Sequence, residues 1–206
     1  MATTPTPIPR LTDRKREAIV AAAIVEFRAN GFEATSVDKV AARAAVSKRT
    51  LYNHFASKDD LFAEILRMLW ERSASQLERP YDATQPVRDQ LLALLQQKLA
   101  LLADDSFLAL ARVALASGIH SPERAQEMVA RLGQKEGGLL AWIKAAQKHG
   151  ALKPGDAALA VQQLEGLVKG VAFWPQVAMG QPVLGARARK QVAASTADLF
   201  LSHYAT

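Results

Sequence analysis

The sequence predicts an all-α fold of about nine helices, and three observations lead to this prediction. Apolar residues recur at three- and four-residue spacing along most of the 206 residues. No stretch shows the alternation of apolar and polar residues that is typical of a half-buried strand. Ser, Thr and Asp stand before many of the apolar runs, and Gly or Pro stands after them, which marks helix starts and stops.

The composition is that of an ordinary globular protein. Hydrophobic residues make up 50% of the chain and charged residues 22%, which excludes a wholly disordered protein. The absence of cysteine excludes disulfides, thiolate metal sites and a cysteine nucleophile. No run reaches the roughly 18 apolar residues of a membrane span, and the N-terminus lacks the apolar segment of a signal peptide. We therefore expect a soluble, cytoplasmic protein with no membrane partner.

Positive charge is concentrated near the N-terminus. The chain carries 26 Lys and Arg against 20 Asp and Glu, a net charge of +6. Residues 1–58 contain ten of these basic side chains and five of the acidic ones, a balance of +5, and the remainder is nearly neutral. An excess of this kind favours a polyanionic partner, which we expect at the first quarter of the chain.

The first helix is predicted from Thr12 to Asn30. Residues 1–11 hold three prolines, so we expect a flexible arm there. Thr12 is a suitable N-cap, and Asn30-Gly31 ends the helix, because glycine tolerates the left-handed conformation of a helix stop.

Two short helices follow, over residues 37–44 and 48–54. Hydroxyl residues precede the first, and Ser47 precedes the second, as N-caps do. The pattern is interrupted at Ala45, which predicts a tight turn. A fourth helix over residues 58–78 completes this part of the chain.

The remaining chain is predicted to form five more helices, which begin and end at Pro and Gly residues. Their spans are 85–103, 106–118, 122–149, 154–179 and 184–204. The Gly137-Gly138 pair predicts a kink or break within the third of these.

Two short helices joined by a tight turn, in a unit of clustered positive charge, are typical of a helix-turn-helix DNA-binding domain. A major groove about 12 Å wide admits one helix, whose exposed face must carry side chains that read bases. With Leu51 and Phe55 turned inward, residues 48–54 present almost only hydrogen-bonding side chains. We therefore expect double-stranded DNA as the partner.

Roles can be assigned by position along these helices. Arg49 is the best candidate for a bidentate guanine contact, worth roughly 1–3 kcal/mol of discrimination, and Lys48 either reads bases or binds phosphate. Lys58 and the hydroxyls before residue 37 are candidates for phosphate. His54 is either a DNA contact or a packed, capping residue. The candidate DNA-binding residues are Thr35, Ser36, Ser47, Lys48, Arg49, Thr50, Tyr52, Asn53, His54 and Lys58.

These residues carry a family resemblance. The stretch AARAAVSKRTLYNHFASKDDLF, with Phe27, Gly31 and Phe32 before it, resembles the DNA-binding domain of TetR-family transcriptional regulators over residues 12–72. The C-terminal half, with FWPQVAMG at residues 173–180, is similar to the AefR-like branch of that family. The resemblance implies an all-helical homodimer, with one helix-turn-helix per subunit and a C-terminal domain that binds a small effector.

Two positions depart from the family pattern. Ala45 stands in the turn where glycine is frequent, and a left-handed alanine costs roughly 1–2 kcal/mol, which leaves the geometry of the turn open. Arg49 stands where a glycine often follows the lysine, and it adds a side chain that can read bases.

The chain is thus expected to have three parts. They are a flexible arm over residues 1–11, a helix-turn-helix DNA-binding domain over residues 12–57, and a helical domain for effector binding and dimerisation over residues 58–206. The third part is rich in leucine, most of which we expect in its core.

The larger apolar residues of this third part are candidates for the wall of a pocket that takes a small apolar or amphipathic effector. His120 either orients a polar group of that ligand or lies at the surface near a helix end. The pocket candidates are Trp70, Phe107, His120, Met128, Trp142, Phe173 and Trp174.

The resemblance places the dimer surface on the last two helices. The candidate interface residues are Leu164, Leu167, Val168, Val171, Val192, Leu199 and Phe200. Symmetric pairing would present two recognition helices to successive major grooves, roughly 34 Å apart, and so predicts a pseudo-palindromic operator.

The function favoured is that of a repressor that binds its operator as a homodimer and is released by a small-molecule effector. The alternative is a DNA-binding activator or architectural protein without small-molecule input, and a helical protein-interaction module is a further one. An enzyme is not expected, nor is a metal or cofactor. The four histidines are scattered, no paired carboxylates stand at metal-ligand spacing, and no glycine-rich phosphate loop is present.

Overall fold

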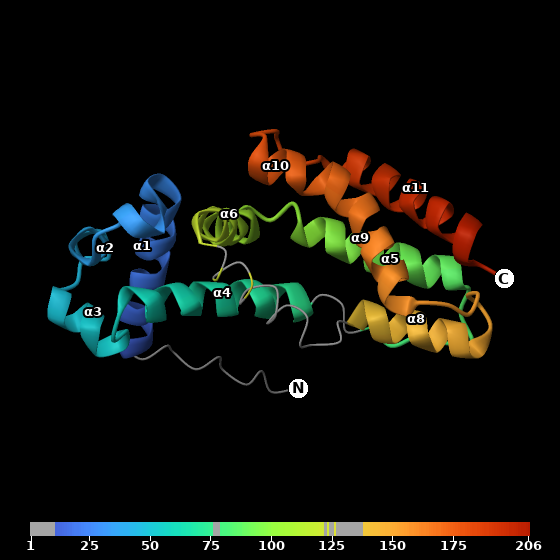
Figure 1. The fold of residues 1–206 in the computed structure, drawn as a ribbon, viewed down its shortest axis with the longest axis horizontal. Coiled ribbons are helices and arrows are strands. Elements are labelled where there is room, and N and C mark those ends of the chain that lie inside the picture. The colour runs from blue at the N-terminus through green and yellow to red at the C-terminus, as the bar shows by residue number, and fades with distance from the viewer. Residues whose placement is uncertain (1–10, 76–78, 122, 124–125, 127–137) are drawn as a thin grey trace, which may run out of the picture.

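The computed structural model describes residues 11–75, 79–121, 123, 126 and 138–206, and nearly all regular structure in these ranges is helical (Figure 1). The one exception is an isolated antiparallel bridge between Leu152 and Ala205. The helices are α1 (Leu11–Ala34), α2 (Val37–Arg43), α3 (Lys48–His54), α4 (Lys58–Ser75), α5 (Val87–Leu101), α6 (Asp105–His120), α8 (Gly138–His149), α9 (Ala157–Ala172), α10 (Trp174–Ala178) and α11 (Ala186–Tyr204). The all-α prediction is confirmed.

One core lies where α1, α2, α3 and the first half of α4 meet, a unit that we call the head. Three aromatic rings form its centre, with centroids of Phe27, Phe32 and Phe62 5.0–6.0 Å apart. Leu51 and Phe55 of the α3 segment are buried in the same core, as their spacing predicts. The head core also takes in two residues of α6, Leu110 and Val113.

The first helix stops regular α geometry where the sequence predicts. Gly31 has φ 77° and ψ 167°, a backbone conformation open almost only to glycine. The kink turns Phe32 back into the head core. Asn30 supports the stop, because its side-chain amide donates to Glu26 O and Glu26 Oε2 at 3.2 and 3.0 Å.

A second core lies between α5, α8, α9 and α11, which we call the body. Its largest fully buried side chain is Trp142 of α8, and the same core contains buried leucines of α5. An ion pair joins α5 to α9 inside the body, between Lys98 and Glu165, and burial lowers the pKa of Lys98. Figure 1 shows α11 along the outer edge of the body and α9 crossing α5 from α10 toward α8, and α9 also contacts α11.

The head and the body are joined through α4 and α6. Figure 1 shows α4 running from the head toward the body with α6 beside it. Near the head, Glu64 of α4 accepts hydrogen bonds from Arg67 and Arg16, which lower the pKa of Glu64 to about 2. Toward the body, Arg72 of α4 donates to Asp104, the N-cap of α6, at 2.9 Å.

The single helix predicted over residues 154–179 is wrong. The structure ends α9 at Ala172, and Phe173 leaves the helical region with φ −133° and ψ −62° before α10 begins. Pro175 explains the break, because proline lacks the amide proton of a helix interior and its ring clashes with the preceding turn. The start is also later than expected, since Asp156 caps α9 through hydrogen bonds from two backbone amides.

Several predictions fall at or beyond the edge of the described residues. The proposed arm lies there except for Leu11, as do the end of the fourth helix and half of the helix predicted over residues 122–149. The described part of that helix is α8, which begins at Gly138, beside the expected break. Within the described ranges, no helix has the length and hydrophobicity to cross a bilayer.

Candidate nucleic-acid interface

Each of the two short helices begins at a serine that caps it. The hydroxyl of Ser36 accepts a hydrogen bond from Asp38 N at 3.1 Å, and that of Ser47 accepts one from Thr50 N at 3.0 Å. Side-chain capping satisfies amides that a helix start leaves unpaired, and each cap is worth about 1 kcal/mol. The local sequence therefore sets where α2 and α3 begin.

The turn between them keeps a left-handed residue although it holds no glycine. Ala45 has φ 53°, and Val46 N donates to Ala41 O at 3.0 Å to close the end of α2. The turn that the departure from glycine left open thus has the tight geometry of a helix-turn-helix.

The outer face of α3 is exposed and polar. Lys48, Arg49, Tyr52 and Asn53 are exposed, whereas Leu51 is fully buried beneath them. Arg49 forms no hydrogen bond or ion pair with another residue of the described ranges, so its five donors are available to a partner. Thr50 and His54 are half-buried at the edges of this face.

Lys48 differs from Arg49 because it has an intramolecular partner. Its ammonium lies 2.9 and 3.1 Å from the two carboxylate oxygens of Asp38, at the start of α2. The hydrogen bond to Asp38, together with the negative charge, raises the pKa of Lys48.

The structure corrects the expectation for Thr35. This residue is 3% exposed, and its hydroxyl oxygen lies 2.7 Å from Gly31 O and 3.1 Å from Glu26 O. The single hydroxyl proton is shared between carbonyls at the end of α1, so it is not directed at a phosphate. Ser36, one residue later, is the N-cap of α2 and is half-buried.

Lys58 is likewise turned inward. Its ammonium donates to Phe32 O at 2.8 Å, Glu33 O at 3.1 Å and Thr35 O at 3.4 Å, and it lies 4.4 Å from the centre of the Phe32 ring. All three protons of the ammonium are used to close the end of α1, which corrects the phosphate role expected for this residue.

The pocket candidates are scattered over the body. Phe107 and Trp142 are core residues, Phe173 is half-buried against the same core, and Trp174 is 44% exposed. Exposure removes Trp174 from the wall of an enclosed pocket in this protomer. Met128 and the side chains of Trp70 and His120 lie outside what the structure describes.

A hollow of about 380 Å³ does lie beside Trp142, between α8 and the segment that precedes α5. Arg79, Pro80 and Tyr81 line it from that segment, and small residues of α8 line the other side. The Tyr81 ring meets the Trp142 ring edge-on, with centroids 5.6 Å apart.

The dimer candidates divide into two groups. Leu164, Val168 and Phe200 are buried in the core of the same protomer, and Val192 is half-buried against it. These four therefore pack within the chain, which corrects their assignment to an interface. The remaining three, Leu167, Val171 and Leu199, are exposed by 40%, 48% and 57%.

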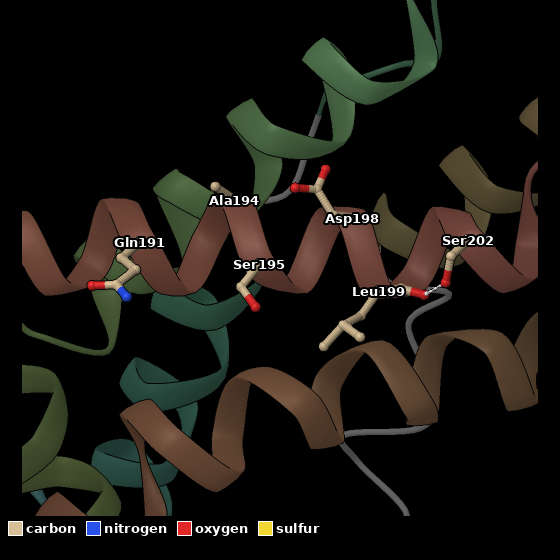
Figure 2. A pocket seen from close by; sticks show the side chains of 6 residues that line it. All are labelled: Gln191, Ala194, Ser195, Asp198, Leu199 and Ser202. Atoms are coloured by element: carbon tan, nitrogen blue, oxygen red, sulfur yellow. Dashed lines mark hydrogen bonds between the residues drawn. The ribbon is translucent and has the colours of Figure 1, made fainter.

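The exposed face of α11 is hollowed. Figure 2 shows the side chains that line a depression of about 530 Å³ along this helix. They are Gln191, Ala194, Ser195, Asp198, Leu199 and Ser202. Small side chains make this face shallow, and Leu199 is its largest apolar group.

Comparison with known proteins decides the family. The family described as "AefR-like transcriptional repressor, C-terminal domain" matches residues 89–206, which is more than half of the chain, and "Bacterial regulatory proteins, tetR family" matches residues 19–65. The chain belongs to the TetR family. Its AefR-like C-terminal half agrees with the resemblance carried by residues 173–180.

Relatives from this family align over different lengths. A TetR-family transcriptional regulator from Pseudomonas syringae pv. tomato str. DC3000, known from its crystal structure, is 50% identical with a TM-score of 0.83, over 95% of this chain and 98% of that chain. The flavonoid-responsive regulator FrrA is 26% identical with a TM-score of 0.71, over 93% and 97%. The HTH-type transcriptional activator FasR of Mycolicibacterium smegmatis is 32% identical over 84 residues, 41% of this chain and only 38% of FasR.

Two features of the site were not assigned from the sequence. Asp38 falls in the first turn of the helix predicted over residues 37–44, but its position beside Lys48 was not predicted, since the nine residues between them include a turn whose geometry the sequence left open. On α9, Gly166 and Gly170 are exposed and lie four residues apart, and a Cβ atom at either position would contact no atom of the described part of the protomer. In the sequence, the four-residue spacing of the two glycines could have indicated that both lie on one face of a helix.

Proposed function

We propose that this TetR-family chain is a non-catalytic DNA-binding regulator, a repressor that binds a pseudo-palindromic operator as a homodimer and is released by a small apolar or amphipathic effector. The observation that carries the proposal is the exposed polar face of α3, where Arg49, beside the capped start of the helix, has no partner among the residues that the structure describes. Buried Leu51 and Phe55 hold this face outward.

The DNA-binding part rests on what such a face can contact. A guanidinium at the start of a recognition helix can donate two parallel hydrogen bonds to guanine O6 and N7. Tyr52 and Asn53, on the same face, suit contacts to the sugar-phosphate backbone that set the register. Half-buried His54 and Thr50 take contacts at the edge of this surface.

The homodimer rests on the face formed by α9 and α11. Leu167, Val171 and Leu199 leave apolar surface uncovered there. Gly166 and Gly170 each cost about 1 kcal/mol relative to alanine inside a helix, and no described residue of the protomer fills the space that they leave. A helix of a second copy that crosses α9 closely would fill this space.

The effector response rests on the connection between head and body. Since α6 contributes to the head core and is tied to α4 by Arg72 and Asp104, a ligand that moves α6 would move the head. A coupling free energy of roughly 1–3 kcal/mol would suffice. FrrA, with a similar fold, is described as responsive to flavonoids, which supports a small-molecule effector for this chain.

A second candidate is an activator that binds DNA in the same way. FasR is described as an activator, and the AefR-like family is described as one of repressors. A reporter gene behind the operator separates the two, because loss of the protein raises its expression under repression and lowers it under activation.

The direct test is selection of an operator from a random-sequence duplex library with the full chain, followed by titration with Arg49→Ala. We expect a palindromic sequence to be enriched, and the variant to bind it at least about 30-fold more weakly, since the homodimer loses one bidentate contact in each half-site and each is worth roughly 1–3 kcal/mol. Binding to scrambled duplex should change much less. Equal losses on both duplexes would remove the base-reading role of Arg49, and no enrichment at low salt would remove the proposed function.

A further inference from the structure

An exposed ion pair joins the first turns of the two helices that would face DNA. Asp38 in the first turn of α2 and Lys48 in the first turn of α3 lie with Nζ and Oδ1 2.9 Å apart. The side chain of Lys48 is 55% exposed and that of Asp38 is 66% exposed, so burial does not fix the position of either side chain. Arg49, the next residue, has no such partner among the described residues.

The position of the carboxylate is unfavourable for DNA binding. In a helix-turn-helix the first helix crosses the phosphate backbone while the second lies in the groove. A negative charge in the first turn of α2 therefore approaches phosphates, and it also neutralises the ammonium that would bind them. Capping of α2 does not require this charge, because the Ser36 hydroxyl supplies the cap.

The ion pair is weak enough for a DNA phosphate to replace Asp38 as the partner of Lys48. Exposed ion pairs contribute about 0–1 kcal/mol, since both charges are well solvated. A phosphate can therefore displace Asp38 from Lys48, but only at the cost of leaving the carboxylate beside the DNA.

We propose that Asp38 is a positioning residue that restrains Lys48 and thereby lowers the affinity of the protein for DNA of any sequence. The inference rests on the proposed function, because it requires α3 to enter a groove. Each phosphate that a lysine neutralises contributes about 0.9 to the slope of log K against log salt. While Asp38 holds Lys48, this lysine does not neutralise a phosphate of non-specific DNA. The contacts of Arg49 with bases are unaffected. Competition from the many non-specific sites of a genome is reduced accordingly.

The test measures binding of the full chain to a fluorescein-labelled 30-bp duplex of mixed sequence, by anisotropy between 50 and 200 mM NaCl. For Asp38→Asn we expect about five- to tenfold tighter binding at 50 mM and a salt slope that is steeper by about two, one for the Lys48 of each subunit of the proposed homodimer. Asp38→Glu keeps the carboxylate and should stay within about twofold of the wild type.

The effect must act through Lys48. In a Lys48→Gln background, adding Asp38→Asn should change the affinity by less than about twofold and leave the slope unchanged. Glu17→Gln removes the same charge from exposed α1 and controls for net charge. If Asp38→Asn tightens binding equally with and without Lys48, or tightens it in neither, the inference is overturned while the proposed function stands. If the wild type binds no duplex at 50 mM NaCl, the proposed function fails first.

Discussion

Ala45 turns the chain between α2 and α3 in a conformation that alanine rarely adopts. It is the one non-glycine residue in the described ranges with a positive φ. Left-handed backbone crowds the Cβ atom against the following carbonyl, so the residue is strained where glycine would not be. The turn is kept because Ser47 and the buried Leu51 fix α3 on its far side.

Replacement of Ala45 by glycine should stabilise the protein. Relief of the strain, reduced by the greater entropy of glycine in the unfolded chain, should raise the free energy of unfolding by about 0.5–1 kcal/mol. Urea denaturation followed by circular dichroism measures this change. Ala44→Gly is the matched control, because Ala44 has φ −76° and should lose stability on the same substitution. A loss of stability in both variants would show that Ala45 is not strained.

At the scale of elements, α4 is held at three points along its length. Lys58 ties its start to the end of α1, Glu64 ties its middle to Arg16, and Arg72 ties its far part to the cap of α6. The helix thus belongs to the head at one end and reaches the body at the other. The division of the chain after residue 57 stays a prediction, and the head core receives side chains from beyond it.

Lys58→Met should weaken the head. The variant keeps an apolar stem but removes three charge-assisted hydrogen bonds and the contact with the Phe32 ring, so we expect a loss of about 1–3 kcal/mol in the free energy of unfolding. Thermal and urea unfolding of the full chain give the value. Lys39→Met, at an exposed position on α2, should stay within about 0.5 kcal/mol. If the two variants were equally stable, the Lys58 contacts would contribute nothing measurable.

At the scale of the whole molecule, α9 and α11 expose apolar side chains that the described part of the protomer leaves uncovered. One side of α9 completes the body core through Leu164 and Val168, and the other side exposes Leu167 and Val171 beside two glycines. A helix with apolar residues on both sides needs two partners, and the described part of the protomer supplies one. The second copy proposed above is the other.

Leu167→Glu should therefore separate the dimer. A carboxylate forced into an apolar contact should weaken association by about 3 kcal/mol or more, over 100-fold in dissociation constant. Sedimentation equilibrium should show the wild type at twice the 22.3 kDa chain mass and the variant at 22.3 kDa. Val25→Glu alters an equally exposed residue of α1 and should remain dimeric. A variant that dimerises as tightly as the wild type would place the interface elsewhere.

Much of the head could be read from the sequence because its signals are local. The caps Ser36 and Ser47, the glycine stop at residue 31 and the inward Leu51 act within one or two helical turns. Their geometry follows from chain chemistry, and the exposed face of α3 follows from them. The helix break at Pro175 depends on an equally local signal. It was not predicted, because the long apolar run around this proline favoured one continuous helix.

The partners of long side chains were decided only by the tertiary structure. Lys58 reaches carbonyls that lie 23 to 26 residues away in sequence, and Asp38 meets Lys48 only because the turn at Ala45 is left-handed. Periodicity showed that α9 is apolar but not which apolar residues face the protomer. A helical pattern specifies that a surface must be covered, whereas the covering element is set by how distant parts of the chain pack. The exposed polar face of α3 could therefore be predicted from the sequence, whereas the division of apolar residues between the core and the surface could not.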